Sequence, residues 1–251
     1  MENGRPYVMS LAGLDPSAGA GLLADIKTFE ALGVYGLGVC TALTVQTDTR
    51  FVSVEWLPAS QIIAQARPLL ETFPVQYCKI GIVQDATSML EVIQSFRGIQ
   101  PDIRFILDPV LKASAGYTFH DATQLAVWKQ VLQQLYLLTP NYQEALLLSG
   151  EEDGHAAAST LATCCAVLLK GGHRQERPGV DSLYIGKTDI IDIPAGTDAV
   201  FPKHGSGCVL SAAITAQLAT GSSLPVACIR AKLYTEKFLA SHSSLLGYHI
   251  T

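Results

Sequence analysis

The stretch Phe201-Pro-Lys-His-Gly-Ser-Gly-Cys-Val-Leu-Ser-Ala-Ala-Ile-Thr-Ala-Gln-Leu-Ala219 organises the chain. Its Gly-Ser-Gly turn runs into small and apolar residues without proline, which predicts a helix from Cys208 to Ala219. The first N–H groups of a helix have no partner within it and, with the helix dipole, form an anion-binding site. An ordinary glycine turn opening a buried helix would have the same sequence. Residues elsewhere in the chain must decide between an anion site and an ordinary buried helix.

Outward from this stretch, short apolar runs alternate with segments of helical periodicity. Strands are predicted at 7–12, 34–45, 51–57, 77–83, 105–111, 135–138 and 165–170, and a hairpin at 182–185 and 190–193. Helices are predicted at 22–32, 59–72, 86–96, 121–132, 208–219 and 224–245. The alternation predicts an α/β protein of three layers, with helices on both faces of a mainly parallel sheet. No repeat or linker interrupts it, so we expect one domain over 1–251.

The bulk composition narrows the function classes. The chain has 251 residues, 49% hydrophobic and 16% charged, with a net charge of -5. This mildly acidic balance gives no support for nucleic acid or an anionic membrane as a partner. Neither a signal peptide nor a bilayer-spanning run is visible. Six scattered cysteines without a Cys-x-x-Cys pair favour reduced thiols in the cytoplasm over disulfides or a zinc site.

Polar residues follow most of the apolar runs within a few positions. They are Asp15, Gln46, Asp108, Asn141, Glu144, Lys170 and His173. Because ligands bind beyond the carboxyl ends of the strands in parallel sheets, we expect these residues to share one site. Any one of them alone would more often be a solvated loop residue or a helix cap. Gly186-Lys-Thr188 is not a P-loop, because the required earlier glycine is Asp181, and we interpret it as a hairpin turn.

Seven segments together carry a resemblance to a known family. They are Gly13–Thr28, Thr41–Gln46, Lys79–Gly81, Asp108–Val110, Leu138–Ala145, Leu169–His173 and His204–Cys208. In this order they closely resemble the hydroxymethylpyrimidine/phosphomethylpyrimidine kinases of thiamine biosynthesis, of the ribokinase-like superfamily. The resemblance implies a ribokinase-like fold, ATP and magnesium, and a homodimer. It also implies phosphorylation of 4-amino-5-hydroxymethyl-2-methylpyrimidine, and then of its monophosphate.

By this resemblance, residues 205–208 form the catalytic centre. The backbone N–H groups around Gly205, Ser206 and Gly207 would hold the negative charge that develops on the transferred phosphoryl group. Cys208 would accept the proton of the substrate hydroxyl, at a position where most ribokinase-like sugar kinases have aspartate. A helix N-terminus lowers a thiol pKa, so we expect a thiolate near neutral pH. A small buried thiol that only packs is the alternative.

The resemblance also places the pyrimidine. Gln46 offers both a donor and acceptors, which match a ring nitrogen beside an amino group. The other residues implied at this site are Asp25, Gly19, Ala20, Gly21, Ile82 and Val110. A solvated helix face remains the alternative for Asp25, and a plain core position for Ile82 and Val110.

The nucleotide side is expected at three strand ends. Lys170 is placed to meet ATP phosphate, with an ordinary surface lysine as the alternative. Asp108, Asn141 and Glu144 carry oxygens suited to magnesium and its waters, with Asp108 and Glu144 acting through water. Asn141 and Glu144 could equally cap the next helix.

Departures from the family pattern concern substrate choice more than the reaction. Ser206 replaces a usual threonine, and the segments 47–49 and 108–116 differ from the usual sequences. A pyridoxal or pyridoxine kinase is the first rival, because pyridoxine is also a flat hydroxymethyl heteroaromatic. A protein that binds nucleotide or pyrimidine without catalysis is the second. A sugar kinase is disfavoured, because Cys208 replaces the usual aspartate and Gln46 suits a heterocycle.

Overall fold

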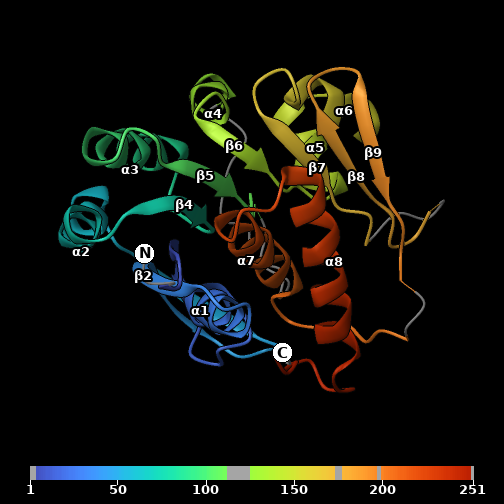
Figure 1. Ribbon diagram of the computed structural model, residues 1–251, viewed down its shortest axis with the longest axis horizontal. Coiled ribbons are helices and arrows are strands. Elements are labelled where there is room, and N and C mark those ends of the chain that lie inside the picture. The colour runs from blue at the N-terminus through green and yellow to red at the C-terminus, as the bar shows by residue number, and fades with distance from the viewer. Residues whose placement is uncertain (1–3, 112–124, 173–176, 197–198, 250–251) are drawn as a thin grey trace.

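The structure, a computed structural model, describes residues 4–111, 125–172, 177–196 and 199–249 (Figure 1). Its strands are β1 (Tyr7–Leu14), β2 (Tyr35–Gln46), β3 (Phe51–Trp56), β4 (Val75–Ile80), β5 (Arg104–Leu107), β6 (Leu135–Leu138), β7 (Ala166–Leu169), β8 (Asp181–Ile185) and β9 (Asp189–Ile193). Its helices are α1 (Gly21–Ala31), α2 (Ala59–Thr72), α3 (Ala86–Ile99), α4 (Leu125–Leu132), α5 (Tyr142–Ser149), α6 (Gly154–Leu161), α7 (Ser206–Ala219) and α8 (Leu224–Ala240).

All nine described strands form one sheet, in the order β3-β2-β1-β4-β5-β6-β7-β8-β9. The strands from β2 to β7 in this order pair in parallel, whereas β3, β8 and β9 pair antiparallel with their neighbours. The mainly parallel sheet is therefore confirmed. The chain leaves β1 for β2 on one side and later returns to pair β4 on the other side. This reversal makes the gap between the carboxyl ends of β1 and β4 a topological switch point. Ligands of α/β sheets usually bind at such a point.

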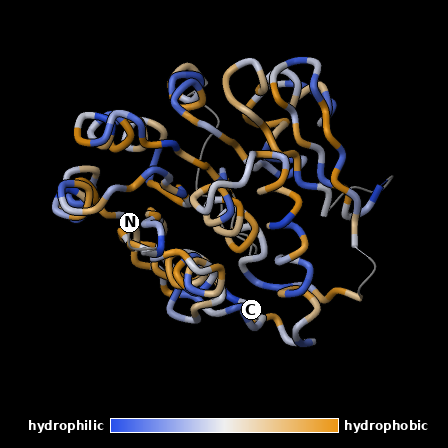
Figure 2. The backbone as a smooth tube through the Cα atoms, viewed as in Figure 1, coloured by the Kyte–Doolittle hydropathy of each residue, from blue (hydrophilic) through white to orange (hydrophobic). Residues whose placement is uncertain are grey.

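Helices cover both faces of the sheet, as predicted (Figure 1). Alternate strand residues point to opposite faces, so each strand contributes to two separate cores. Met9, Cys78 and Phe105 face one core, which α2 to α6 complete. Tyr77 and Ile106 face the other core, which α7 and α8 complete. Hydrophobic and hydrophilic residues accordingly alternate along the outer helices α2 and α3 (Figure 2).

Helix α7 is the most enclosed helix of the second core. Val209, Ala212, Ala213, Ile214 and Ala216 have no exposed surface, because the helix lies between α1, α8 and the sheet. A helix that is apolar on all sides is typical of such a buried position. Its few hydroxyl groups bond within the helix, as Thr215 does to the carbonyl of Ser211 at 2.8 Å. Burial therefore fixes the position of its first turn, which contains Ser206, Gly207 and Cys208.

Several element boundaries differ from the predictions. Strand β5 ends at Leu107 rather than at residue 111, because Pro109 cannot donate to a ladder. Strand β4 ends at Ile80, and α8 ends at Ala240 rather than at 245. Helix α6 was not predicted, since its small residues carry only a weak apolar stripe. It begins where the Asp153 side chain accepts hydrogen bonds from the next turn.

Two other sequence features can be compared with the structure. Gly186–Thr188 lies between β8 and β9, which pair antiparallel, so the hairpin turn is confirmed. The predicted helix at 121–132 is described only from Leu125, as α4.

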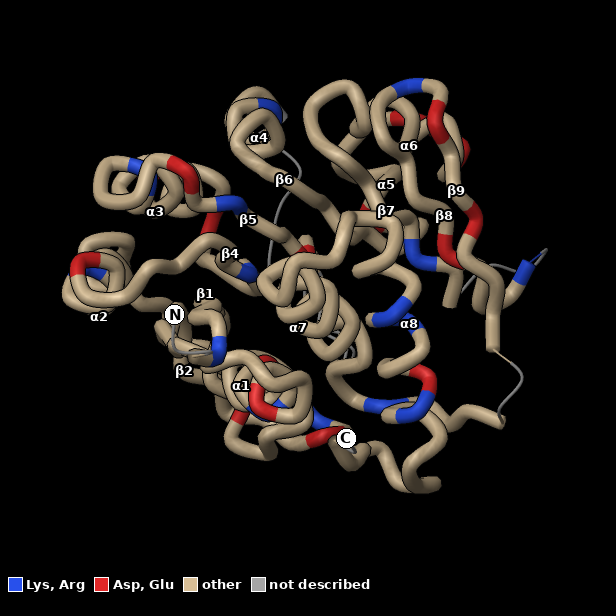
Figure 3. The backbone as a smooth tube through the Cα atoms, viewed as in Figure 1, with Lys and Arg blue, Asp and Glu red and all other residues tan. Residues whose placement is uncertain are grey.

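Charged residues of both signs occur throughout the described part of the chain. Lysine, arginine, aspartate and glutamate residues are spread over helices and loops (Figure 3). Among the described residues, no helix combines the length and the apolar character that crossing a bilayer requires.

The packing of α1 between β1 and α7 gives a stability test. Phe29 is fully buried among Val8, Val34, Ala212 and Ala216. We expect Phe29→Ala to lower the free energy of unfolding by about 3–5 kcal/mol, through lost burial and a cavity. The control Leu147→Ala, at a side chain 51% exposed, should change it by less than about 0.5 kcal/mol. Urea unfolding measures both, and equal midpoints for the two variants would contradict this packing.

Candidate active site

A row of polar side chains crosses the carboxyl ends of the parallel strands. Tyr77, Ile106, Leu137 and Leu168, one each on β4, β5, β6 and β7, all face the core beneath α7 and α8. Two positions further along each strand, on the same face, the residues are Lys79, Asp108, Thr139 and Lys170. Since side chains repeat every second residue in a strand, this spacing places the four polar groups together. The shared site expected for Asp108 and Lys170 is therefore present. Lys79 and Thr139 were not singled out as site residues.

Lys170 is bound by two carboxylates. Its Nζ lies 2.7 Å from Asp108 Oδ1 and 3.8 Å from Glu144 Oε2. Burial alone would lower the pKa of Lys170, but Asp108 and Glu144 raise it above its ordinary value. Burial raises the pKa of Glu144, against the opposing effect of Lys170. Lys170 is thus a charged, mostly buried lysine rather than a surface one.

Asn141 and Glu144 form a capping box at the start of α5. Asn141 Oδ1 accepts from the Glu144 N–H at 2.9 Å, and Glu144 Oε2 accepts from the Asn141 N–H at 2.7 Å. The capping alternative is therefore correct for both residues. The same box also turns Glu144 towards Lys170, so the cap helps to position a charge of the site.

The glycine turn of α7 packs directly on the loop that follows β1. Gly205 has a φ of 76°, and a Cβ atom on it would lie 2.1 Å from the carbonyl oxygen of Gly19 and 2.7 Å from the Cα atom of Ala20. Gly21 has a φ of 58°, and a Cβ there would lie 2.2 Å from the Gly13 carbonyl oxygen. Only glycine allows these approaches. The structure therefore brings the predicted residues Gly19, Ala20 and Gly21 to the predicted anion site.

A hydrogen bond between Asp15 and His204 joins the two loops. His204 Nε2 lies 2.9 Å from Asp15 Oδ2, which also accepts from the N–H of Ala20 at 2.9 Å. Burial alone would raise the pKa of Asp15, but hydrogen bonds from His204, Ser17 and Ala20 together lower it. Asp15 was a predicted polar strand-end residue, whereas its partner His204 was missed. The buried His204 Nδ1 has no hydrogen-bond partner within the described residues.

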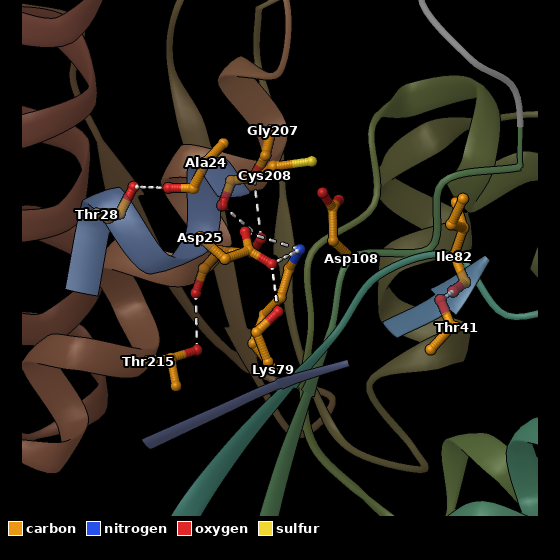
Figure 4. A network of polar contacts seen from close by, with 12 residues as sticks. Ala24, Asp25, Thr28, Thr41, Lys79, Ile82, Asp108, Gly207, Cys208 and Thr215 are labelled. Atoms are coloured by element: carbon orange, nitrogen blue, oxygen red, sulfur yellow. Dashed lines mark hydrogen bonds and ion pairs between the residues drawn. The ribbon is translucent and has the colours of Figure 1, made fainter. Parts of the chain in front are cut away.

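Asp25 is held in a buried ion pair with Lys79. It is fully buried, and Lys79 Nζ lies 2.8 Å and 3.1 Å from its two carboxylate oxygens. The hydroxyl of Ser10 donates to it at 2.5 Å. Figure 4 shows Asp25 and Lys79 pointing towards each other beside Cys208 and Asp108. The alternative of a solvated helix face is therefore wrong for Asp25, whereas its contact with pyrimidine stays a prediction. A lysine inside an apolar strand was the signal for such a pair.

Cys208 lies in the first turn of α7, partly exposed. Burial raises the pKa of its thiol to about 11, while Lys79 and the N–H of Gly21 act in the opposite direction. The expected thiolate near neutral pH is therefore wrong for the ligand-free protein. A helix N-terminus alone does not offset the desolvation of the sulfur and the nearby carboxylates of Asp25 and Asp108.

Gln46, Ile82 and Val110 lie at or just beyond the ends of β2, β4 and β5. Gln46, half-buried at the end of β2, donates to Thr44 Oγ1 at 2.9 Å, and Thr44 in turn donates to the carbonyl of Leu14. A Cβ atom on Gly13 would lie 2.5 Å from Ile82 Cδ1, so Ile82 packs beside the glycine loop. Val110 is half-buried just after Asp108.

Two predicted features cannot be placed. His173 and the part of the 108–116 segment beyond Leu111 lie outside the described residues.

Magnesium would find few protein ligands here. In the described part of the chain, no three His, Cys, Asp or Glu side chains gather as a metal site. Magnesium bound with a nucleotide typically needs only one or two carboxylates besides phosphates and water. Asp108 and Glu144, on either side of Lys170, are a donor set of that kind.

The arrangement combines three chemical functions at one point. The first turn of α7 presents unpaired N–H groups that favour an anion. A Cβ atom on Gly207 would lie 3.3 Å from Asp108 Oδ2 and 3.4 Å from Lys170 Nζ, so a cation and a carboxylate lie directly against this turn. Cys208 adds an ionisable group beside them. Such a set can hold a phosphoryl group and an alcohol together.

The close approach at Gly205 can be tested against a matched glycine. Gly33 has a φ of 75°, close to the 76° of Gly205, but a Cβ on it would meet nothing within 4 Å. Alanine at either position pays about 1–2 kcal/mol for the left-handed backbone. Gly205→Ala should lose about 1–3 kcal/mol more, because it displaces the loop at Gly19. Urea unfolding measures the difference, and equal losses would show that the loops do not touch.

Known proteins are similar to this chain in sequence and in fold. A family model described as phosphomethylpyrimidine kinase matches residues 15–250. The hydroxymethylpyrimidine/phosphomethylpyrimidine kinase of Rhizobium meliloti (strain 1021) is 35% identical, with 94% of this chain and 91% of that protein covered. The phosphomethylpyrimidine kinase structure from Clostridium difficile 630 matches with a TM-score of 0.78 and 30% identity, covering 92% of this chain and 98% of that one.

A second structural relative has a different named substrate. The pyridoxal kinase from Staphylococcus aureus, in complex with ADP, matches with a TM-score of 0.81 and 26% identity, covering 95% of this chain and 89% of that one. These structures confirm the ribokinase-like three-layer fold. The family model spans most of the chain, and the bacterial relative exceeds 30% identity over nearly its whole length. This chain therefore belongs to the phosphomethylpyrimidine kinase family, and it is a phosphotransferase.

Proposed function

We propose that this protein uses ATP to phosphorylate 4-amino-5-hydroxymethyl-2-methylpyrimidine, and then the resulting monophosphate, in thiamine biosynthesis. One observation carries the proposal. The first turn of α7 lies against Asp108 and Lys170 on one side and against the glycine loop at Gly19 on the other. A phosphoryl donor and a flat acceptor would therefore meet at residues 205–208. The names of the relatives support this choice of acceptor.

On the nucleotide side, Lys170 would exchange its carboxylate partner Asp108 for a phosphate of ATP. Its charge is neutralised by Asp108 at 2.7 Å while no phosphate is present. A phosphate of ATP would attract the ammonium, which frees an oxygen of Asp108 for a magnesium-bound water. Bound magnesium would supply charge neutralisation on the phosphates, and Asp108 and Glu144 would orient its waters. The turn at 205–207 would donate N–H groups to the transferred group.

On the acceptor side, Cys208 would take the hydroxyl proton. The substrate oxygen forms its bond to phosphorus as its proton passes to the sulfur. The bond from phosphorus to the leaving ADP oxygen breaks, and its electron pair stays on ADP. Because the thiol has a pKa of about 11 in the ligand-free protein, it must first lose its own proton to water. Turnover limited by this ionisation would rise with pH above neutrality.

The pyrimidine ring would lie over the glycine loop. Gln46 would pair with the edge that carries the amino group. Gly19, Ala20 and Gly21 would leave room for the flat ring, with Ile82 and Val110 beside it.

The direct test is a product analysis. We expect the protein, given ATP, magnesium and the hydroxymethylpyrimidine, to yield the mono- and diphosphate by mass spectrometry. Pyridoxal is offered in parallel, under the same conditions. Absence of both pyrimidine products, with ATP unconsumed, would reject the proposed activity.

Pyridoxal phosphorylation is the second candidate. It is favoured by the structural match to a pyridoxal kinase at a TM-score of 0.81. Pyridoxal also carries a hydroxymethyl group on a flat heteroaromatic ring. The ratio of kcat/KM for the two acceptors decides between the candidates, since this ratio measures specificity.

The proton acceptor can be tested by substitution. We expect Cys208→Ala to lower kcat by about 100-fold or more, as the loss of a general base does. The wild-type kcat should rise between pH 7 and pH 9, because the thiol pKa lies above this range. The residual activity of the variant should lose this rise. Near-wild-type turnover in Cys208→Ala would remove the thiol from the mechanism.

The proposal includes a homodimer in the cytoplasm. Reduced cysteines and an ATP-dependent reaction fit that compartment. Light scattering at the working concentration measures the oligomeric state.

A further inference from the structure

A buried ion pair lies at the switch point of the sheet. Lys79 on β4 and Asp25 on α1 both have fully buried side chains, with Nζ–O distances of 2.8 Å and 3.1 Å. Ser10 of β1 faces the pair from the neighbouring strand, in register with Lys79. A Cβ atom on Gly81 would lie 3.2 Å from Lys79 Nζ, so this glycine leaves space for the ammonium.

Stability alone does not account for this pair. Removing two charges from water costs several kcal/mol per ion, and well-packed apolar residues often replace such pairs without loss. Tyr77 and Ile106, which lie next to Lys79 on the same face of the sheet, belong to the hydrophobic core. A charged pair at a buried position beside the site therefore indicates a functional role for its charge.

Lys79 lies among the groups that determine the charge on Cys208. The negative groups around the sulfur are Asp25 on α1 and Asp108 after β5. Two cations act on it, Lys79 on β4 and Lys170 after β7, and Lys79 is the larger influence on the thiol. Lys170 and Glu144 lie further along the row, where Lys170 is bound to Asp108. Cys208, Asp108 and Asp25 in turn favour the charged form of Lys79. Figure 4 shows Lys79 extending towards Asp25 on the side where Cys208 and Asp108 lie.

We propose that Lys79 is a positioning residue for the reaction: its ammonium, held by Asp25, stabilises negative charge on the sulfur of Cys208. The S–H bond breaks, the electron pair stays on sulfur, and the proton passes to water. The resulting thiolate can then accept the proton of the acceptor alcohol. This inference rests on the proposed function, in which Cys208 is the proton acceptor. Asp25 therefore acts through Lys79 rather than through the substrate.

The test measures thiolate formation directly, without nucleotide, magnesium or pyrimidine. Iodoacetamide alkylates the thiolate, forming a thioether and releasing iodide, so its rate follows the ionised fraction. The rate at Cys208 is measured by peptide mass spectrometry from pH 7 to pH 10. Cys40, which is also partly exposed, reports on reagent access in the same sample.

Four variants separate charge from structure. Lys79→Met should slow alkylation of Cys208 by about tenfold or more, since a cation within a few ångström lowers a thiol pKa by about one unit or more. Lys79→Arg keeps the charge and should restore part of the rate. Asp25→Asn should change the rate less than Lys79→Met, because it removes both a carboxylate that opposes the thiolate and the partner that keeps the Lys79 ammonium charged. Loosened packing would instead accelerate alkylation in Lys79→Met and Asp25→Asn alike, because it exposes the sulfur.

The fourth variant, which changes both residues, controls for the effect of an unpaired buried charge on folding. Lys79→Met leaves the buried Asp25 without its cation, so Lys79→Met/Asp25→Asn removes both charges together. Alkylation of Cys208 in this double variant should still be slower than in the wild type, because Lys79 acts on the sulfur more strongly than Asp25. A folded double variant whose Cys208 reacts as fast as the wild type would overturn the inference. Circular dichroism and an unchanged rate at Cys40 establish that the variant is folded.

Kinase assays distinguish this inference from the proposed function. The double variant should lose kcat while its KM for ATP stays within about twofold, because its nucleotide contacts are unchanged. Slower alkylation in a protein that phosphorylates neither pyrimidine nor pyridoxal would reject the proposed function but support the charge relation. Unchanged alkylation in an active kinase would reject the role of Lys79 and leave the function in place.

Discussion

The site depends on alternating charges held in a desolvated row. Along the carboxyl ends of the central strands, Asp25, Lys79, Asp108, Lys170 and Glu144 alternate in sign. Each charge is tolerable because a partner of opposite sign lies beside it, whereas any one of them alone would be very costly to bury. The row is therefore specified as a unit. Its members come from five separate elements, which the sheet and its covering helices hold together.

Helix α7 adds an anion-binding site to this row of charges. Because it is buried on all sides between α1, α8 and the sheet, its first turn cannot move away from the strand ends. Gly205 and Gly207 allow that turn to approach the loop at Gly19 and the Asp108–Lys170 pair without a clash. The anion site is thus preorganised, and preorganised dipoles avoid the cost of reorienting during the reaction.

The state of Cys208 illustrates the balance between local and tertiary effects. Its place in the first turn of a helix favours a thiolate, but burial and two carboxylates outweigh this local effect. Because the pKa of the thiol is raised, its ionisation depends strongly on the neighbouring cation Lys79. Lys79 is therefore of greater consequence than its position inside an apolar strand would indicate.

The sequence by itself determined the layered α/β fold, the order of most elements, and the family. It also identified Asp108, Glu144 and Lys170 as neighbours, because strand ends in a parallel sheet must share one edge, and the family resemblance added the 205–208 turn. The tertiary structure alone decided which side chains contact one another along that edge of the sheet. It paired Asp25 with Lys79, joined Asp15 to His204 and set the pKa of the Cys208 thiol. Periodicity along a chain reveals which face a residue occupies, but burial, partner distance and the resulting electrostatics arise only when distant segments pack.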